Sequence, residues 1–133
     1  MALAKDRDTQ RRDGALLSDP VAAAAKIYTG ALVALNAAGD AVPATAAVAQ
    51  KTRGVAQALA DNTAGIAGAV KVATRRGVFN FKNAAADLVV RADIGKSCYV
   101  VDDETVAKTD SVGTRPVAGV IRDVDATGVW VEI

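Results

Sequence analysis

The sequence contains no histidine and only one cysteine. Without an imidazole there is no Ser-His or Cys-His catalysis, no histidine metal site and no histidine pH switch. A single cysteine, Cys98, rules out an intramolecular disulfide. Cys98 lies in the apolar run 97–101, which favours a small buried core residue over a reactive thiol. We therefore expect a protein that is not an enzyme.

The chain also lacks an excess of charge and a long apolar run. Its 16 Lys and Arg residues nearly balance 15 Asp and Glu residues, for a net charge of +1. Binding to nucleic acid or to an anionic membrane surface needs clustered, unbalanced cations. No stretch reaches the ~18 uninterrupted apolar residues of a membrane-spanning helix, and the start lacks the apolar middle of a signal peptide. We expect a protein made and kept in a cytosol, with no nucleic-acid or membrane partner.

Aromatic residues are scarce at 4%, although 51% of the residues are apolar. Alanine supplies much of the apolar fraction, and each buried alanine removes little area from water. The 133 residues fit one domain with a modest core. We therefore expect partner subunits to cover part of the apolar surface.

Residues 1–23 differ from the rest of the chain. They read MALAKDRDTQRRDGALLSDPVAA, in which four basic residues mix with four aspartates. Gly14 and Pro20 interrupt any helix, and no apolar period is sustained. The segment predicts an extended N-terminal arm, and a solvated tail is the alternative.

Residues 24–133 alternate short apolar segments with turn-forming residues, which is typical of a barrel or sandwich. We expect a mainly β fold: a compact small β-barrel or sandwich with the extended arm and at most one short helix, at 88–94. Alanine runs at 21–25 and 44–49 favour helix but are short and lie beside proline. Expected strands cover residues 26–28, 31–35, 41–42, 54–59, 69–75, 77–82, 97–101, 117–124 and 129–133.

The clearest element is the C-terminal hairpin, in which residues 117–124 and 129–133 flank the turn 125–128. Its alternation places Val129 and Val131 on one face and Trp130, the largest candidate for burial, on the other. We expect the Asp125 side chain to bond to the turn backbone. The acids at 102–104 are adjacent rather than alternating, so a solvated turn is favoured over a calcium loop.

Two basic pairs are candidates for contacts with other proteins. Arg75 and Arg76 stand between two expected strands, so they form either an exposed hairpin end or a salt-bridging contact with a neighbouring subunit. Arg11 and Arg12 are too few to bind nucleic acid. The alternating charges around them suit a segment lying on a mixed-charge protein surface, and equally a soluble tail. The predicted interface residues are Lys5, Arg7, Arg11, Arg12, Leu16, Leu17, Arg75 and Arg76.

The spacing of glycines and strands over residues 24–133 resembles the capsid cement proteins of tailed phages and prophages. The likeness is carried by the segments 26–33, 54–56, 68–79, 93–103 and 118–131, and the arm carries no matching motif. The resemblance implies a virion protein that is made in the bacterial cytoplasm and binds the outside of an assembled capsid. It also implies homotrimers at three-fold or quasi-three-fold sites that clamp the major capsid protein, with no cofactor and no catalysis.

Two alternatives remain at this stage. One is another virion component, such as a tail or head-completion protein. The other is a small β-barrel ligand-binding module or hydrolase, which predicts a pocket with convergent polar groups. The missing histidine and scarce aromatics disfavour the second alternative.

Overall fold

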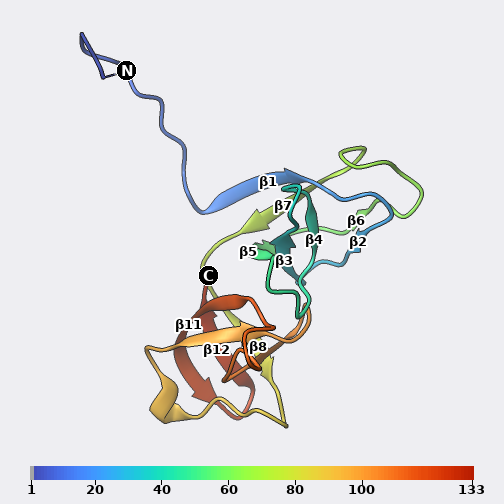
Figure 1. Ribbon diagram of the computed structural model, residues 1–133, viewed down its shortest axis with the longest axis vertical. Coiled ribbons are helices and arrows are strands. Elements are labelled where there is room, and N and C mark those ends of the chain that lie inside the picture. Colours follow the sequence, from blue (N-terminus) through green and yellow to red (C-terminus); the bar gives the residue numbers. More distant parts are fainter. Residues whose placement is uncertain (1) are drawn as a thin grey trace.

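The computed structural model describes residues 2–133. Within these residues the chain forms twelve β-strands and one short 3-10 helix, η1 (Arg91–Asp93), which lies inside the segment expected to be a short helix or turn. The mainly β prediction is confirmed. The strands form a five-stranded sheet, a closed barrel and a small two-stranded sheet (Figure 1).

The five-stranded sheet is entirely antiparallel. Its strand order is β1-β7-β5-β3-β4. Just beyond β1, Val21 forms a parallel bridge with Ala41 at the start of β4. The strands of this sheet are β1 (Leu16–Pro20), β3 (Leu32–Leu35), β4 (Ala41–Pro43), β5 (Lys51–Ala56) and β7 (Lys71–Arg75), and the two-stranded sheet pairs β2 (Lys26–Ile27) with β6 (Ala60–Asp61).

The remaining five strands close into a barrel in the order β10-β8-β12-β11-β9, so of the two predicted alternatives, barrel or sandwich, this part is a barrel. The β10–β8 pair is parallel and the other neighbours are antiparallel. Closure leaves no unpaired strand edge on this part of the molecule. The barrel strands are β8 (Val78–Asn83), β9 (Ser97–Val100), β10 (Thr105–Ala107), β11 (Val117–Asp125) and β12 (Gly128–Glu132).

The expected C-terminal hairpin is present as β11 and β12. Val129 and Val131 are fully buried, as the alternation predicts. Asp125 accepts a hydrogen bond from the Thr127 N–H at 2.8 Å, so the predicted turn contact also forms. Trp130, however, is only partly buried. Its Nε1–H donates to the second oxygen of Asp125 at 2.9 Å, which holds the indole at the barrel surface.

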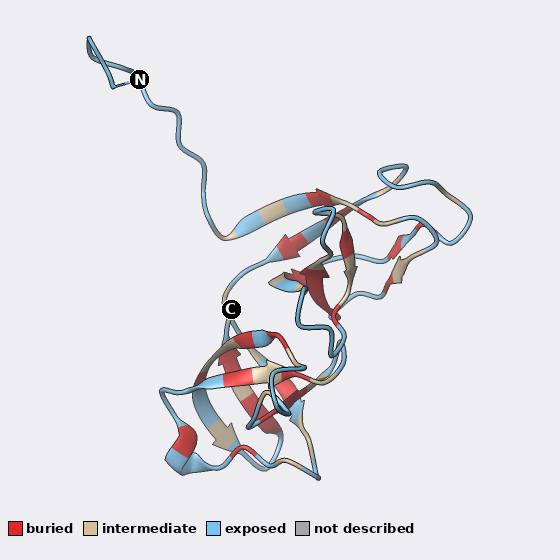
Figure 2. Cartoon of the chain, in the orientation of Figure 1, coloured by how far each residue is buried: buried red, intermediate tan, exposed pale blue. Residues whose placement is uncertain are grey.

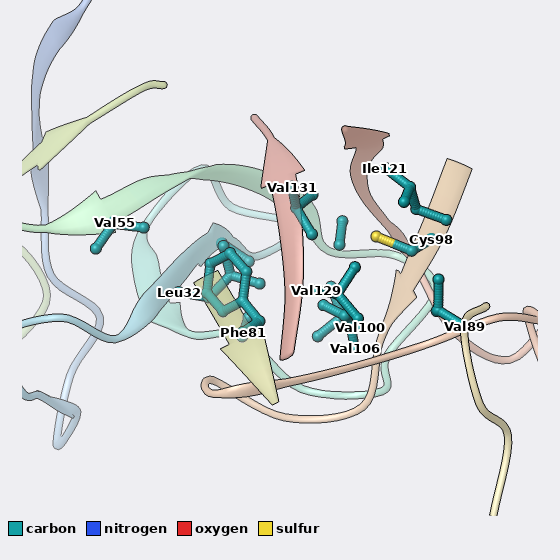
Figure 3. Packing of buried hydrophobic residues seen from close by; sticks show 13 residues of the cluster. Leu32, Val55, Phe81, Val89, Cys98, Val100, Val106, Ile121, Val129 and Val131 are labelled. Carbon is teal, nitrogen blue, oxygen red and sulfur yellow. The ribbon is translucent and has the colours of Figure 1, made fainter. Parts of the chain in front are cut away.

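Buried residues lie along strands of both the five-stranded sheet and the barrel (Figure 2). They form two hydrophobic clusters on opposite faces of the five-stranded sheet. In β3, Leu32 and Ala34 belong to the cluster shared with the barrel, while Val33 belongs to the second cluster, as strand alternation requires. Figure 3 shows the shared cluster, in which Leu32 from the sheet lies beside Phe81 of the barrel, and Val55 belongs to the same cluster. Because this cluster crosses from the sheet to the barrel, the two parts form one body.

Cys98 lies in the shared cluster and is fully buried, as expected. Its Sγ lies 3.7 Å from the carbonyl oxygen of Gly119. Burial raises the pKa of the thiol to about 12. The thiolate is therefore scarce at neutral pH, and the cysteine is a packing residue.

The N-terminal arm is shorter than the sequence predicts. Residues 2–14 are exposed, form no strand and run away from the body (Figures 1 and 2). Residues 16–20, which fall within the predicted arm of 1–23, instead form strand β1, and Val21 is fully buried. The extended part therefore ends near Ala15, because the following residues find a pairing partner in β7.

Candidate protein interface at the root of the arm

Strand β1 has one unpaired edge, and the arm joins the body at this strand. β1 is the terminal strand of its sheet, with β7 as its neighbour. The Arg76 N–H donates to the Ala15 carbonyl at 2.8 Å, and the Val21 N–H donates to Val70 at 2.9 Å. These bonds show that odd-numbered residues of β1 turn their main-chain groups toward β7. The main-chain groups of Leu16 and Ser18 therefore point outward.

The outward edge ends at Pro20, which has no N–H to offer. Leu16 is 50% exposed and Ser18 is also exposed. Two N–H and two C=O groups are thus available to an incoming strand, within the part of the chain that the structure describes. Such an edge is a template for pairing with another chain.

Four of the eight predicted interface residues converge at this place. Leu16 lies directly opposite Arg75 in the β1–β7 register. Leu17 and Arg76 line the same cleft. Arg75 is the last residue of β7, and Arg76 lies between β7 and β8. The sequence prediction placed both residues between two strands, so it is off by one residue. The other four residues (Lys5, Arg7, Arg11 and Arg12) lie along the exposed arm, away from this cluster.

The cleft has a volume of about 370 Å³ and lies between the five-stranded sheet and the barrel. Its lining residues are Leu17, Thr52, Arg53, Arg76, Val117, Ala118, Gly119, Glu132 and Ile133. Most of its polar side chains are already engaged. The Thr52 hydroxyl donates to the Val117 carbonyl at 2.6 Å, and Glu132 pairs with Arg122. A binding pocket needs polar groups free for a ligand, and of the charged side chains here only Arg76 has no ion pair within residues 2–133.

An ion pair that the sequence did not reveal fixes β1 in place. Arg53 on β5 donates two hydrogen bonds to Asp19 on β1, at 2.8 and 3.0 Å. Asp19 is only 7% exposed. These hydrogen bonds raise the pKa of Arg53, so the guanidinium remains charged. The bidentate geometry ties β1 to β5 across the intervening strand β7.

Charges without a partner are distributed unevenly over the molecule. Within residues 2–133, eight of the 16 cationic side chains lie within 4 Å of a carboxylate. The eight cations without such a partner all belong to the arm, to β5, to β7 or to the residue after β7. They are Lys5, Arg7, Arg11, Arg12, Lys51, Lys71, Arg75 and Arg76. The arm and the sheet at its root therefore carry the cations that are available to another molecule.

The acidic turn at 102–104 forms contacts within the chain. Asp102 accepts a hydrogen bond from the Glu104 N–H at 3.0 Å, and Glu104 pairs with Lys82. Burial, followed by the nearby charge of Asp102, raises the pKa of Asp103. Across residues 2–133, no group of three or more His, Cys, Asp or Glu side chains is arranged to hold a metal ion.

Comparison of this chain with family models, with curated proteins and with solved structures found no match. The resemblance to capsid cement proteins therefore stays a prediction. None of the helical structure in residues 2–133 is long and apolar enough to cross a membrane.

Proposed function

We propose that this protein is a structural virion protein that binds the outer surface of an assembled phage capsid. In this role it acts as a trimer at three-fold or quasi-three-fold sites and clamps neighbouring copies of the major capsid protein. The observation that carries the proposal is the combination of a well-packed β body with an exposed, extended arm that is rooted beside an open strand edge.

The arm suits a contact with a large surface. Residues 2–14, fully extended, span about 45 Å, which exceeds the width of a small domain. Extended segments commonly bind by adding a strand to an exposed sheet edge, where main-chain hydrogen bonds provide the affinity. The alternating charges of the arm suit a protein surface that carries both signs.

The body suits a permanent clamp. Its barrel is closed, so the unpaired strand edges lie on the two sheets, and the edge of β1 lies at the root of the arm. The Arg53–Asp19 pair anchors β1 to the sheet, so a force on the arm passes into the core. On a symmetric lattice each weak contact is repeated, and copies already bound raise the effective concentration for the next contact.

The test uses undecorated capsids assembled from the major capsid protein encoded in the same genome. The full chain is mixed with them and imaged by electron microscopy, and added density is expected on the outer surface at three-fold positions. A variant lacking residues 2–13 should keep the circular dichroism spectrum of the full chain, because β1 begins at Leu16. It should bind the capsid at least about tenfold more weakly, since it loses the segment that adds main-chain contacts.

Point variants separate the arm from the body. The double substitution Arg11→Ala and Arg12→Ala should weaken capsid binding, whereas Arg122→Ala on the exposed barrel surface should not. Absence of density on the outer surface would refute the proposal. Density at one vertex or on the tail would instead place the protein among the other virion components.

A further inference from the structure

We propose that the open edge of β1 is the docking site for the arm of a second copy of this chain, so that neighbouring copies exchange arms. This inference rests on the oligomeric part of the proposed function. It assigns the surface that joins the copies, which is separate from the surface that meets the capsid.

The edge offers a definite pattern of hydrogen bonds. Leu16 and Ser18 each present one N–H and one C=O to the outside. Pro20 has no N–H, and just beyond it the Ala22 N–H already donates to the Ala41 carbonyl where Val21 bridges to Ala41. A strand of four or five residues laid along this edge satisfies these groups by ordinary sheet pairing. Pro20 ends the ladder, which fixes how far the added strand runs.

The side chains beside the edge favour an acidic strand. On β7, Arg75 stands opposite Leu16 and Lys71 stands opposite Pro20, so both cations share the exposed face of these positions. Between them, Ser18 and Ala73 form a small pair. An added strand lies about 10 Å from β7, two strand spacings away. A long Arg or Lys side chain that leans over the small Ser18–Ala73 pair reaches a carboxylate on that strand.

The arm carries carboxylates in the required pattern. Lys5, Asp6, Arg7 and Asp8 alternate in sign along the sequence. In an extended strand, successive side chains point to opposite faces, so Asp6 and Asp8 lie on one face and the two cations on the other. Bound with its acidic face toward Arg75 and Lys71, the arm pairs charges that have no ion-pair partner within residues 2–133 of the single chain.

The arm of the same copy does not cover this edge. At the root of the arm, the Ala15 N–H donates to the Asp13 side chain at 3.1 Å. From this point the arm leaves the body and runs away from β1 (Figure 1). Each copy therefore has an arm to give and an edge to receive one. A head-to-tail exchange of this kind closes into a ring when the rotation between copies is a fraction of a turn, as in a trimer.

The first experiment uses a proline that removes only an outward N–H. Because the Ser18 N–H points away from β7, Ser18→Pro preserves the β1–β7 pairing while blocking the edge, and Ser18→Ala keeps the N–H as the matched control. Sedimentation of the free protein over a range of concentrations should show self-association that Ser18→Pro weakens by about fivefold to tenfold. Ser18→Ala should associate like the original chain, and thermal melts confirm that both variants fold.

The second experiment joins the two segments directly. Two single variants, Gln10→Cys on the same face of the arm as Asp6 and Asp8 and Ser18→Cys at the edge, are mixed, with one carrying a size tag. Mild oxidation should give a disulfide-linked pair of unequal chains. The buried Cys98 does not interfere. Thr127→Cys, on an exposed turn of the barrel, replaces the edge cysteine as the control and should give no such pair.

The outcomes distinguish this inference from the proposed function. A chain that is monomeric at all concentrations, or an oligomer that Ser18→Pro and removal of residues 2–13 leave unchanged, overturns the exchange of arms. If Ser18→Pro abolishes capsid binding but leaves self-association intact, the edge receives a capsid strand and the inference is likewise overturned. If the mixed disulfide forms while capsids remain bare, the inference stands and the proposed function fails.

Discussion

Asn62 provides the most direct test of how the body holds its N-terminal strand, because one substitution replaces its hydrogen-bond donors with a charge. The residue is 2% exposed. Its Nδ2 donates to the carbonyl oxygens of Val21, Ala22 and Ile66 at 3.2, 3.0 and 2.9 Å. One amide therefore joins the loop after β6 to the chain that follows β1. Asn62→Asp preserves the shape of the side chain but places a carboxylate oxygen against three carbonyl oxygens.

The expected loss follows from those contacts. The amide has two hydrogens, which it shares among the three carbonyl oxygens. Each hydrogen bond contributes about 0.5–1.5 kcal/mol net, so these contacts together contribute about 2–3 kcal/mol. Asn62→Ala should lower the free energy of unfolding by that amount. Asn62→Asp should cost about 4 kcal/mol at pH 7, because an unpaired buried charge adds to the loss. For a chain of this length the melting temperature should fall by about 10–15 °C.

The pH dependence provides the sharper criterion. Unfavourable contacts with carbonyl oxygens and burial both raise the folded-state pKa of the introduced carboxyl group above its unfolded value of about 3.9. The protonated form is then favoured in the folded state. The penalty is smallest below the unfolded pKa and grows as the pH rises toward the folded pKa. Measured against the original chain at each pH, the loss should be clearly smaller at pH 4 than at pH 7.

Urea denaturation followed by circular dichroism measures these differences. Asn80→Asp is the matched control, because Asn80 is exposed and its Nδ2 donates a single hydrogen bond, to Thr127. It should change stability by less than about 0.5 kcal/mol at either pH. If Asn62→Asp is as stable as the original chain at pH 7, or if its loss does not depend on pH, the role assigned to Asn62 is wrong.

Three further substitutions test other contacts by thermal and urea denaturation. Arg53→Lys replaces the bidentate contact with Asp19 by a point charge and should lower the free energy of unfolding by about 1 kcal/mol. Backbone amides of β1 should also exchange their hydrogens faster, and unchanged exchange would show that the pair does not anchor the strand. Gly119→Ala places a Cβ 2.2 Å from the Glu132 carbonyl oxygen and should cost about 2–3 kcal/mol, so a neutral result would contradict the close approach of β11 to β12. Thr74→Val removes a buried hydroxyl that has no hydrogen-bond partner within residues 2–133 and should be neutral or stabilising, whereas a clear loss would reveal a missed partner.

The sequence predicted those parts of the fold that depend on neighbouring residues. The hairpin of β11 and β12 is local, and its alternation and turn were sufficient to predict it. Strand β1 was missed because its partner β7 lies more than 50 residues away, and because Asp19 looks like a surface residue until Arg53 meets it. Trp130, the largest candidate for burial, is only partly buried, because its N–H has a partner at the surface.

The candidate site was predictable to a similar extent. The pairs at Leu16, Leu17, Arg75 and Arg76 were noted separately from their local charge and apolarity, and the β1–β7 register brings them together. No local signal indicates which main-chain groups of β1 face outward. That property depends on which strand pairs with β1 and on the parity of the hydrogen bonds.

The order of strands in the barrel has a consequence for synthesis on the ribosome. β8 ends at Asn83, yet its antiparallel neighbour β12 begins only at Gly128. The five-stranded sheet, complete by Arg75, is made before its covering barrel, so the face bearing Leu32 and Val55 stays exposed while some 50 further residues are translated. At about 5–20 residues per second, this interval lasts several seconds. A chain released early in that interval presents an uncovered apolar face, which makes nascent and truncated forms the species most prone to aggregation.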